Sequence, residues 1–402
     1  MMRFLLVDDD QYKRKAIVDF LASKGVERES ISVAEHAAAA RVKLSESAFD
    51  VLLLDVLLPV RAGARPAGEH SVELLRQIVE DGTSTAPQFI IGITADAKGT
   101  LGYAAEFKSL VTQVVDFNTG DGVWQEMLTV LLQLLRRQEQ AKQTNDYDVV
   151  VLDALRSPEL ECLLKVWPVK LGAEKLLCQN ILHSTGTLEL DGTTRRVACA
   201  HLSQMGPIAS AHAAATLLTE YRPRLLVMTG ICGGFSKEVS IGDLVIADKS
   251  WDWQAGKWTE EGMLAPSVDP RDGAADLVAY ARTIGDVVKL AHDSFAGHEK
   301  PVNTPKLVVG PMVTGSAVVA SKDVQEVFKG QHRKMAGIDM ECYGMYYAAS
   351  NHAGASVRTL CIKAVSDLAD RAKADDHQQY CSYISAAAML EVVRLHFRNP
   401  RA

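Results

Sequence analysis

Short apolar runs alternate with amphipathic segments along the first third of the chain. The apolar run Phe4–Val7 is followed by Ile17, Phe20 and Leu21 at helical spacing, which predicts a buried strand and then a helix. This alternation continues, and alternating strands and helices are typical of an α/β fold with a doubly wound parallel sheet. Further strands are expected at residues 31–33, 51–54, 89–93 and 111–115.

Polar side chains follow several of these expected strands. Asp8 and Asp9 come directly after the first strand, Asp55 ends the third, and Thr94 ends the fourth. Ligands of doubly wound sheets lie beyond the carboxyl ends of the strands, so these side chains should converge there. Three converging carboxylates cannot all stay ionised without a cation, and oxygen ligands suit Mg²⁺. The sequence therefore predicts a magnesium site formed by Asp8, Asp9 and Asp55.

Across most of residues 1–140 these features resemble the receiver domain of two-component response regulators. The resemblance implies that Asp55 is the phosphoacceptor, that Asp8 and Asp9 help to hold Mg²⁺, and that Thr94 is the switch hydroxyl. It also implies a sensor histidine kinase or phosphotransfer protein as partner. The matching segments are Val7-Asp8-Asp9, Leu54-Asp55-Val56-Leu57-Leu58-Pro59 and Thr94-Ala95.

Two positions in the expected fifth strand depart from the receiver pattern. Family members carry a lysine at its end that contacts the phosphoryl group, whereas this chain has Asp116 there, and Gln113 stands at the aromatic switch position. We expect Asp55 to be modifiable still. With no lysine to bridge the phosphoryl group, and with Asp116 adding a like charge, the modified state should be less stabilised than in a typical receiver. A receiver that only docks to a partner is the alternative.

A helix followed by a linker separates the two halves of the chain. Apolar residues recur at helical spacing over residues 124–135, and charged and amide residues then replace them over residues 136–145. This change indicates an exposed helix end and a linker. We therefore expect domains at residues 1–140 and 148–402, joined by residues 141–147. The leucine-rich helix either packs on the first sheet or pairs with its copy in a dimer.

The second half also alternates between strands and helices, so we predict another α/β domain. A glycine-rich loop at residues 229–234 lets the backbone approach a ligand closely. Asp339 and Glu341 are two residues apart, which would place both on one face of an extended segment. Ser366 and Asp367 end a strand as a pair suited to proton donation. Strands are expected at residues 148–152, 225–228, 244–246 and 360–362, and an alanine-rich helix at residues 209–218.

Taken in order, these pieces of residues 147–397 resemble the nucleoside phosphorylase superfamily. Its nucleosidase branch, which acts on methylthioadenosine and S-adenosylhomocysteine, is the most similar. The matching segments are Ser203-Gln204-Met205-Gly206, Thr229-Gly230-x-x-Gly233-Gly234, Gly242-Asp243-Leu244-Val245, Met340-Glu341 and Ser366-Asp367-x-x-Asp370.

The resemblance implies a role for each of these residues in breaking a bond between purine and ribose. Such cleavage leaves electrons on the base, so an acid must protonate it, and Asp367 is expected to do so near N7 with Ser366 orienting it. Glu341 would accept hydrogen bonds from the ribose hydroxyls and stabilise the cation-like sugar. Met340 would lie against the sugar. No cofactor is expected here. Further substrate contacts are expected from Met205, Gly230, Cys232, Gly233 and Val313.

The loop after the first strand of this domain favours water over phosphate as nucleophile. Nucleosidases activate water with a glutamate in this loop, and Glu159 matches with one extra residue before it, with Glu161 as second choice. Phosphorolytic relatives use a Gly-Asp-Pro turn and arginines, whereas this chain has Leu152-Asp153-Ala154 and only Arg156 nearby. A carboxylate at this place would repel an anion, so hydrolysis is expected.

The sequence indicates less clearly which residues contact the 5′ side of the substrate. Three tryptophans within residues 251–258 could stack on a base or line a subunit contact of a homo-oligomer. Cationic side chains could hold 5′ phosphates, although Arg371 and Lys373 could equally be solvated after Asp370. The cations considered for this subsite are Arg156, Lys257, Arg371 and Lys373.

Composition narrows the class of protein. The 402 residues are 48% hydrophobic and 23% charged, which is an ordinary globular balance. A formal net charge of −7 argues against a DNA-binding protein. The N-terminus lacks the pattern of a signal peptide, and no apolar run is long enough to span a membrane. Seven cysteines without a Cys-x-x-Cys pair favour reduced thiols in the cytoplasm.

Three functions fit these observations. The preferred one is a receiver-regulated purine nucleosidase acting on an adenine nucleoside or nucleotide, with ATP as the sharpest guess. Its architecture resembles effectors of defensive two-component systems against phage. The second is a housekeeping phosphorylase or salvage nucleosidase. The third is a non-catalytic nucleotide sensor, which would have no need of Asp367 and Glu341.

Overall fold

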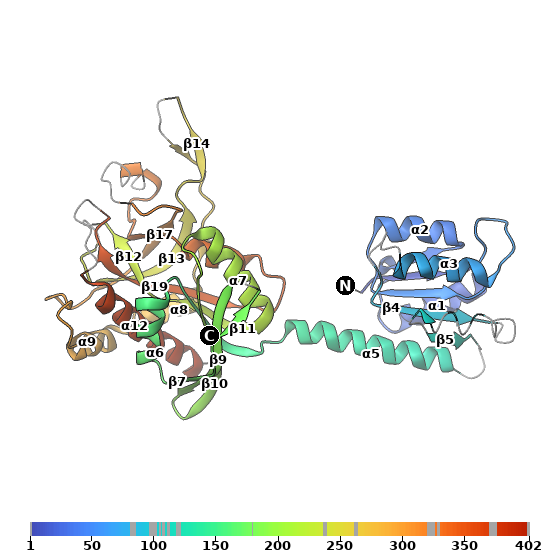
Figure 1. Cartoon of the computed structure of the whole chain (residues 1–402), viewed down its shortest axis with the longest axis horizontal. Helices are drawn as coiled ribbons and strands as arrows, with labels where there is room; N and C mark the ends of the chain where they lie inside the picture. Colours follow the sequence, from blue (N-terminus) through green and yellow to red (C-terminus); the bar gives the residue numbers. More distant parts are fainter. Residues whose placement is uncertain are drawn as a thin grey trace. The chain divides into compact units, whose positions relative to one another are not determined.

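The computed structural model divides the chain into two compact units, residues 1–141 and 142–402, and each is described by itself (Figure 1). Helix α5 runs into the expected linker, and strand β6 begins at its last residue. The described residues are 2–80, 86–95, 103, 106, 109–110, 113–117, 122–178, 180–235, 239–260, 264–319, 326–327, 330–369 and 376–399.

The first unit contains a parallel five-stranded sheet in the order β2-β1-β3-β4-β5, which confirms the expected parallel sheet. Its strands are β1 (Phe4–Val7), β2 (Ile31–Ala34), β3 (Val51–Asp55), β4 (Phe89–Thr94) and β5 (Gln113–Asp116). Its helices are α1 (Gln11–Ser23), α2 (Ala37–Glu46), α3 (Gly68–Val79) and α5 (Val123–Gln143), with a 3₁₀ turn η1 (Arg28–Ser30).

Helices cover both faces of this sheet, which explains why its strands are apolar on both sides. Because successive side chains point to opposite faces, Leu5 packs with α2 and α3, whereas Phe4 packs with α1 and α5. Trp124 of α5 lies in the second of these clusters and is almost completely buried. The carboxyl ends of β1, β3 and β4 therefore meet at one edge of the sheet.

The second unit contains a mixed twelve-stranded sheet in the order β16-β13-β17-β18-β12-β19-β11-β6-β10-β9-β7, with β8 paired to β9. Strands β14 and β15 form a separate hairpin. The strands are β6 (Tyr147–Asp153), β7 (Val169–Leu171), β8 (Lys175–Leu177), β9 (Ile181–Leu190), β10 (Thr193–His201), β11 (Pro223–Met228), β12 (Ile231–Gly234), β13 (Leu244–Asp252), β14 (Gly256–Trp258), β15 (Leu264–Pro266), β16 (Arg271–Asp272), β17 (Leu307–Thr314), β18 (Gly337–Asp339) and β19 (Arg358–Asp367).

Helices pack on both faces of this second sheet. Helix α12 buries an apolar stripe on one face together with α6 and α8, and α7 and α11 cover the other. Strands β6, β11 and β19 are parallel neighbours, so their carboxyl ends lie close together. The helices are η2 (Arg156–Leu160), α6 (Glu161–Val166), α7 (Pro207–Tyr221), α8 (Ala275–Ala281), α9 (Gly285–Ser294), α11 (Cys342–Ser350) and α12 (Gln378–Arg398).

No helix within the described residues combines the length and the apolar character needed to cross a membrane.

Candidate active site

A cavity lies at the carboxyl ends of β6 and β19, beside β12 and β18. Backbone from the glycine-rich loop and apolar residues 317–319 form much of its wall. Segments that are far apart in the sequence therefore meet here. The predicted site residues that line the cavity are Glu159, Met205, Cys232, Gly233, Met340, Glu341, Ser366 and Asp367.

Other predicted residues are not among those lining this cavity. Val313 is fully buried in an apolar cluster with Trp251 and Trp253. Arg156 is exposed and lies 3.5 Å from Glu174, and Lys257 is exposed on β14. Asp370, Arg371 and Lys373 lie outside the described residues. The proposed cationic 5′ subsite thus stays a prediction.

Glu159 is held at the cavity by the backbone. Its side chain is 1% exposed, and its two oxygens accept hydrogen bonds from the backbone N–H groups of Leu155 (2.7 Å) and Ile231 (2.9 Å). Burial raises its pKa to about 8, although Lys363 nearby acts in the opposite direction. Glu161, the second choice, is exposed and accepts a hydrogen bond from Ser157 instead. The geometry therefore favours Glu159.

Gly230 explains how Glu159 approaches the loop so closely. Its φ is +126°, and a Cβ atom at this position would lie 2.0 Å from Oε1 of Glu159. Only glycine combines this backbone conformation with the missing side chain. Gly230 thus contributes by making room for the glutamate.

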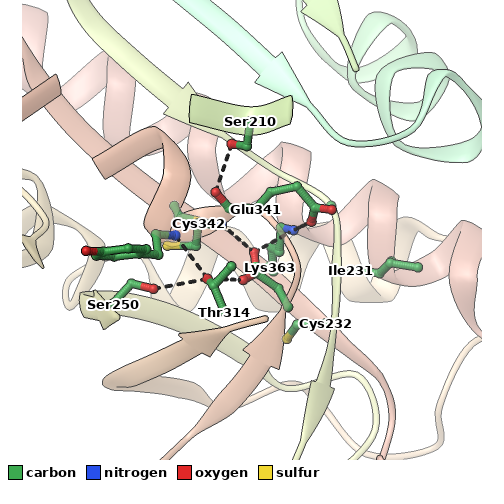
Figure 2. Close-up of polar contacts among 12 residues, drawn as sticks. Ser210, Ile231, Cys232, Ser250, Thr314, Glu341, Cys342 and Lys363 are labelled. Carbon is green, nitrogen blue, oxygen red and sulfur yellow. Dashed lines mark hydrogen bonds and ion pairs between the residues drawn. The ribbon is translucent and has the colours of Figure 1, made fainter. Parts of the chain in front are cut away.

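Lys363 of β19 is the centre of a buried ion network (Figure 2). Its ammonium lies 2.8 Å from Oδ2 of Asp339 and 2.9 Å from Oε2 of Glu341. The network continues to another buried side chain, since Thr314 donates a hydrogen bond of 2.6 Å to Oδ1 of Asp339. Burial alone would lower the pKa of Lys363, but Asp339 and Glu341 hold it well above its usual value. Glu341 is therefore held in place by an ion pair with the buried Lys363.

Asp367 and Ser366 end β19 at the cavity. Oδ2 of Asp367 lies 3.4 Å from the Ser366 hydroxyl, and Oδ1 accepts a hydrogen bond of 2.8 Å from the Ala369 backbone. The same hydroxyl lies 3.5 Å from the carbonyl oxygen of Cys232. The expected pairing of Ser366 with Asp367 is thus present, with one carboxylate oxygen held by backbone.

Asp153, at the end of β6, is a buried carboxyl to which sequence analysis assigned no role. Its Oδ1 accepts hydrogen bonds from the backbone N–H (3.0 Å) and the hydroxyl (2.9 Å) of Thr229. Burial raises its pKa to about 6. Asp153 also adds negative charge near Glu159, which helps to keep the glutamate protonated. The site therefore holds several carboxyls near the buried cation Lys363.

The first unit contains a second polar cluster. Ligand oxygens of Asp8, Asp9 and Asp55 all lie within 4.8 Å of one another, and this all-oxygen set fits Mg²⁺. Burial, and Asp55 next to it, raise the pKa of Asp8 to about 7. Thr94 is buried at the end of β4, while Asp116 is exposed. Asp116 stands where the receiver pattern has a lysine, but a different lysine, Lys13 on α1, contacts both Asp8 and Asp55.

Comparisons with known proteins agree with the geometry of the second unit. The family model described as Phosphorylase superfamily matches residues 180–395. The uncharacterized protein y4jS of Sinorhizobium fredii is 30% identical over 98% of both chains. The ATP nucleosidase Cap17 of Escherichia coli is 26% identical over 73% of this chain and 63% of its own length. A 5′-methylthioadenosine/S-adenosylhomocysteine nucleosidase of Mycobacterium bovis is 26% identical over 56% of this chain and 89% of its own.

Proposed function

This chain belongs to the phosphorylase superfamily, and we propose that it is a purine nucleosidase, which hydrolyses the N-glycosidic bond of an adenine nucleoside or nucleotide. The observation that carries the proposal is the meeting of Asp367, Glu159 and Glu341 in one cavity. The nucleosidases among its relatives support the same chemistry.

These three carboxyls supply what hydrolysis of the bond needs. Asp367 gives its proton to the base as the bond to the sugar lengthens, so the base leaves neutral. Glu341, held by its contact with Lys363, accepts hydrogen bonds from the ribose hydroxyls and stabilises the positive charge that develops on the sugar. Ionised Glu159 takes a proton from water, whose oxygen bonds to the anomeric carbon. The products are free base and free sugar or sugar phosphate.

The finer proposal is that the substrate is ATP and that the first unit controls its cleavage, as in an effector of phage defence. Similarity to an ATP nucleosidase over 73% of the chain supports this substrate. The receiver-like cluster of Asp8, Asp9 and Asp55 supports control of cleavage by the first unit, since an anion attached to Asp55 would change the charge of this cluster. Mg²⁺ held by these three carboxylates would supply positive charge to that anion.

Catalysis should not depend on phosphate. Among the described residues lining the cavity none is cationic, and the carboxyl of Glu159 in the cavity wall would repel phosphate when it is ionised. We expect purified protein to release adenine at the same rate with and without phosphate. Chromatography of adenosine, methylthioadenosine, AMP and ATP reactions would measure this and rank the substrates. A ribose 1-phosphate product that requires added phosphate would show phosphorolysis instead.

The reaction should speed up as pH rises towards 8. Burial raises the pKa of Glu159 to about 8, so below this pH its base form is the minor one. The rate from a base in its minor form falls about 10-fold for each pH unit below its pKa. We expect kcat/KM for base release to rise between pH 6 and pH 8. A profile that is flat over this range would contradict Glu159 as the base.

A further inference from the structure

Lys13 is a buried cation in the acidic cluster of the first unit. It lies on α1, and its side chain is only 2% exposed. Its ammonium is 2.7 Å from Oδ2 of Asp8 and 2.8 Å from Oδ2 of Asp55. It also donates a hydrogen bond of 3.3 Å to the carbonyl oxygen of Ile93. Three oxygen atoms thus lie within 3.3 Å of the ammonium nitrogen.

In this arrangement the ammonium of Lys13 and the carboxylates of Asp8 and Asp55 compensate one another's charge. A buried charge is costly unless it is paired and hydrogen-bonded, and here both carboxylates and the ammonium are removed from water. The two carboxylates lie 2.7 and 2.8 Å from the ammonium, so they compensate its charge inside the cluster.

The position of Lys13 also compensates for the aspartate, Asp116, that stands where the receiver pattern has a lysine. Asp116 is exposed at the end of β5, opposite Thr94 in the sheet, and so is not a buried member of the cluster. Helix α1 provides a cation within 2.8 Å of Asp55 instead. The other oxygen of Asp55 accepts a hydrogen bond from the Leu57 backbone at 3.3 Å. Positive charge thus reaches Asp55 from α1.

We propose that Lys13 is the anion-binding cation of this cluster: it neutralises Asp8 and Asp55 in the unmodified protein and contacts the oxygens of an anionic group attached to Asp55. With an acyl phosphate as donor, a carboxylate oxygen of Asp55 forms a bond to phosphorus. The bond between phosphorus and the acyl oxygen breaks, and the carboxylate leaves with its electron pair. Lys13 then bonds to the transferred oxygens. This inference rests on the proposed control by the first unit, not on base release.

Beryllium fluoride, which mimics a phosphoryl group on a carboxylate, tests this without a phosphodonor. The full chain would be titrated with it at constant Mg²⁺, with calorimetry and the thermal unfolding midpoint as readouts. We expect saturable binding to the wild type, none to Asp55→Asn, and affinity weakened about 10- to 100-fold in Lys13→Met, the effect of losing one charge-assisted bond. Lys15→Met, which removes an exposed lysine of the same helix, should bind like the wild type.

Two results would overturn the proposal: a wild type that does not bind beryllium fluoride, or a Lys13→Met protein that binds it as tightly as Lys15→Met. If the methionine variant does not fold, Lys13→Gln keeps a donor without the charge and should show the same weakening. Adenine release is measured on the same samples. Normal release without fluoride binding means that only this inference fails, whereas absent release with normal binding contradicts the nucleosidase.

Discussion

Replacing Asp367 with asparagine should lower the rate of base release by about 10² to 10⁴-fold, the usual contribution of a general acid. Asparagine has nearly the same shape, so the hydrogen bond from the Ala369 backbone can persist. It has no proton to give to the departing base, which would then leave as an anion. The expected result is a large fall in kcat with substrate affinity largely kept. Single-turnover release of adenine and a separate binding titration would measure the two quantities.

Asp286→Asn is the matched control for this variant. Asp286 is an exposed aspartate on α9, and it does not line the cavity. Its replacement should leave the rate of base release unchanged. A near-native rate for Asp367→Asn would exclude Asp367 as the acid, and an equal loss in both variants would point to damage of the fold.

Much of the fold could be predicted from local pattern. The strands of the first sheet follow from apolar runs that end on polar residues, because a strand buried on both faces must be apolar throughout. The second sheet was harder to predict from the sequence. Strand β9 has a mixed burial pattern, and it pairs with β10, β7 and β8 through contacts that no short window of sequence contains. Those strands were not predicted.

The candidate site could be predicted where the functional residues are adjacent in the sequence, as with Ser366 and Asp367. Lys363 and Lys13 were not identified, because Lys363 pairs with Asp339 and Glu341, and Lys13 with Asp55, across long stretches of sequence. A signal existed in both cases. Lys363 interrupts the apolar run of residues 360–365, and a lysine is almost never fully buried unless it is paired. Lys13 lies four residues before Ile17, so it shares the buried stripe of α1.

Lys363→Met should show how strongly the ion network supports the second unit. The substitution keeps the length and apolar stem of the side chain but removes the charge between Asp339 and Glu341. Breaking a buried pair by removing one partner costs about 3 to 5 kcal/mol, because the other charges stay buried without compensation. We expect the free energy of unfolding in urea to fall by this amount. Lys289→Met, at an exposed position of α9, should leave it nearly unchanged.

Lys363 should also affect catalysis, as a positioning residue for Glu341. Without the ammonium, Glu341 loses the ion pair that holds its carboxyl in place, and the developing positive charge on the sugar is less stabilised. In Lys363→Met, kcat for base release should therefore fall even where the protein is fully folded. Lys363→Arg, which restores the charge, should recover part of kcat. If the arginine variant regains stability but kcat stays as low as in Lys363→Met, the lysine is structural only. Equal kcat in wild type and Lys363→Met would likewise contradict the positioning of Glu341 by this network.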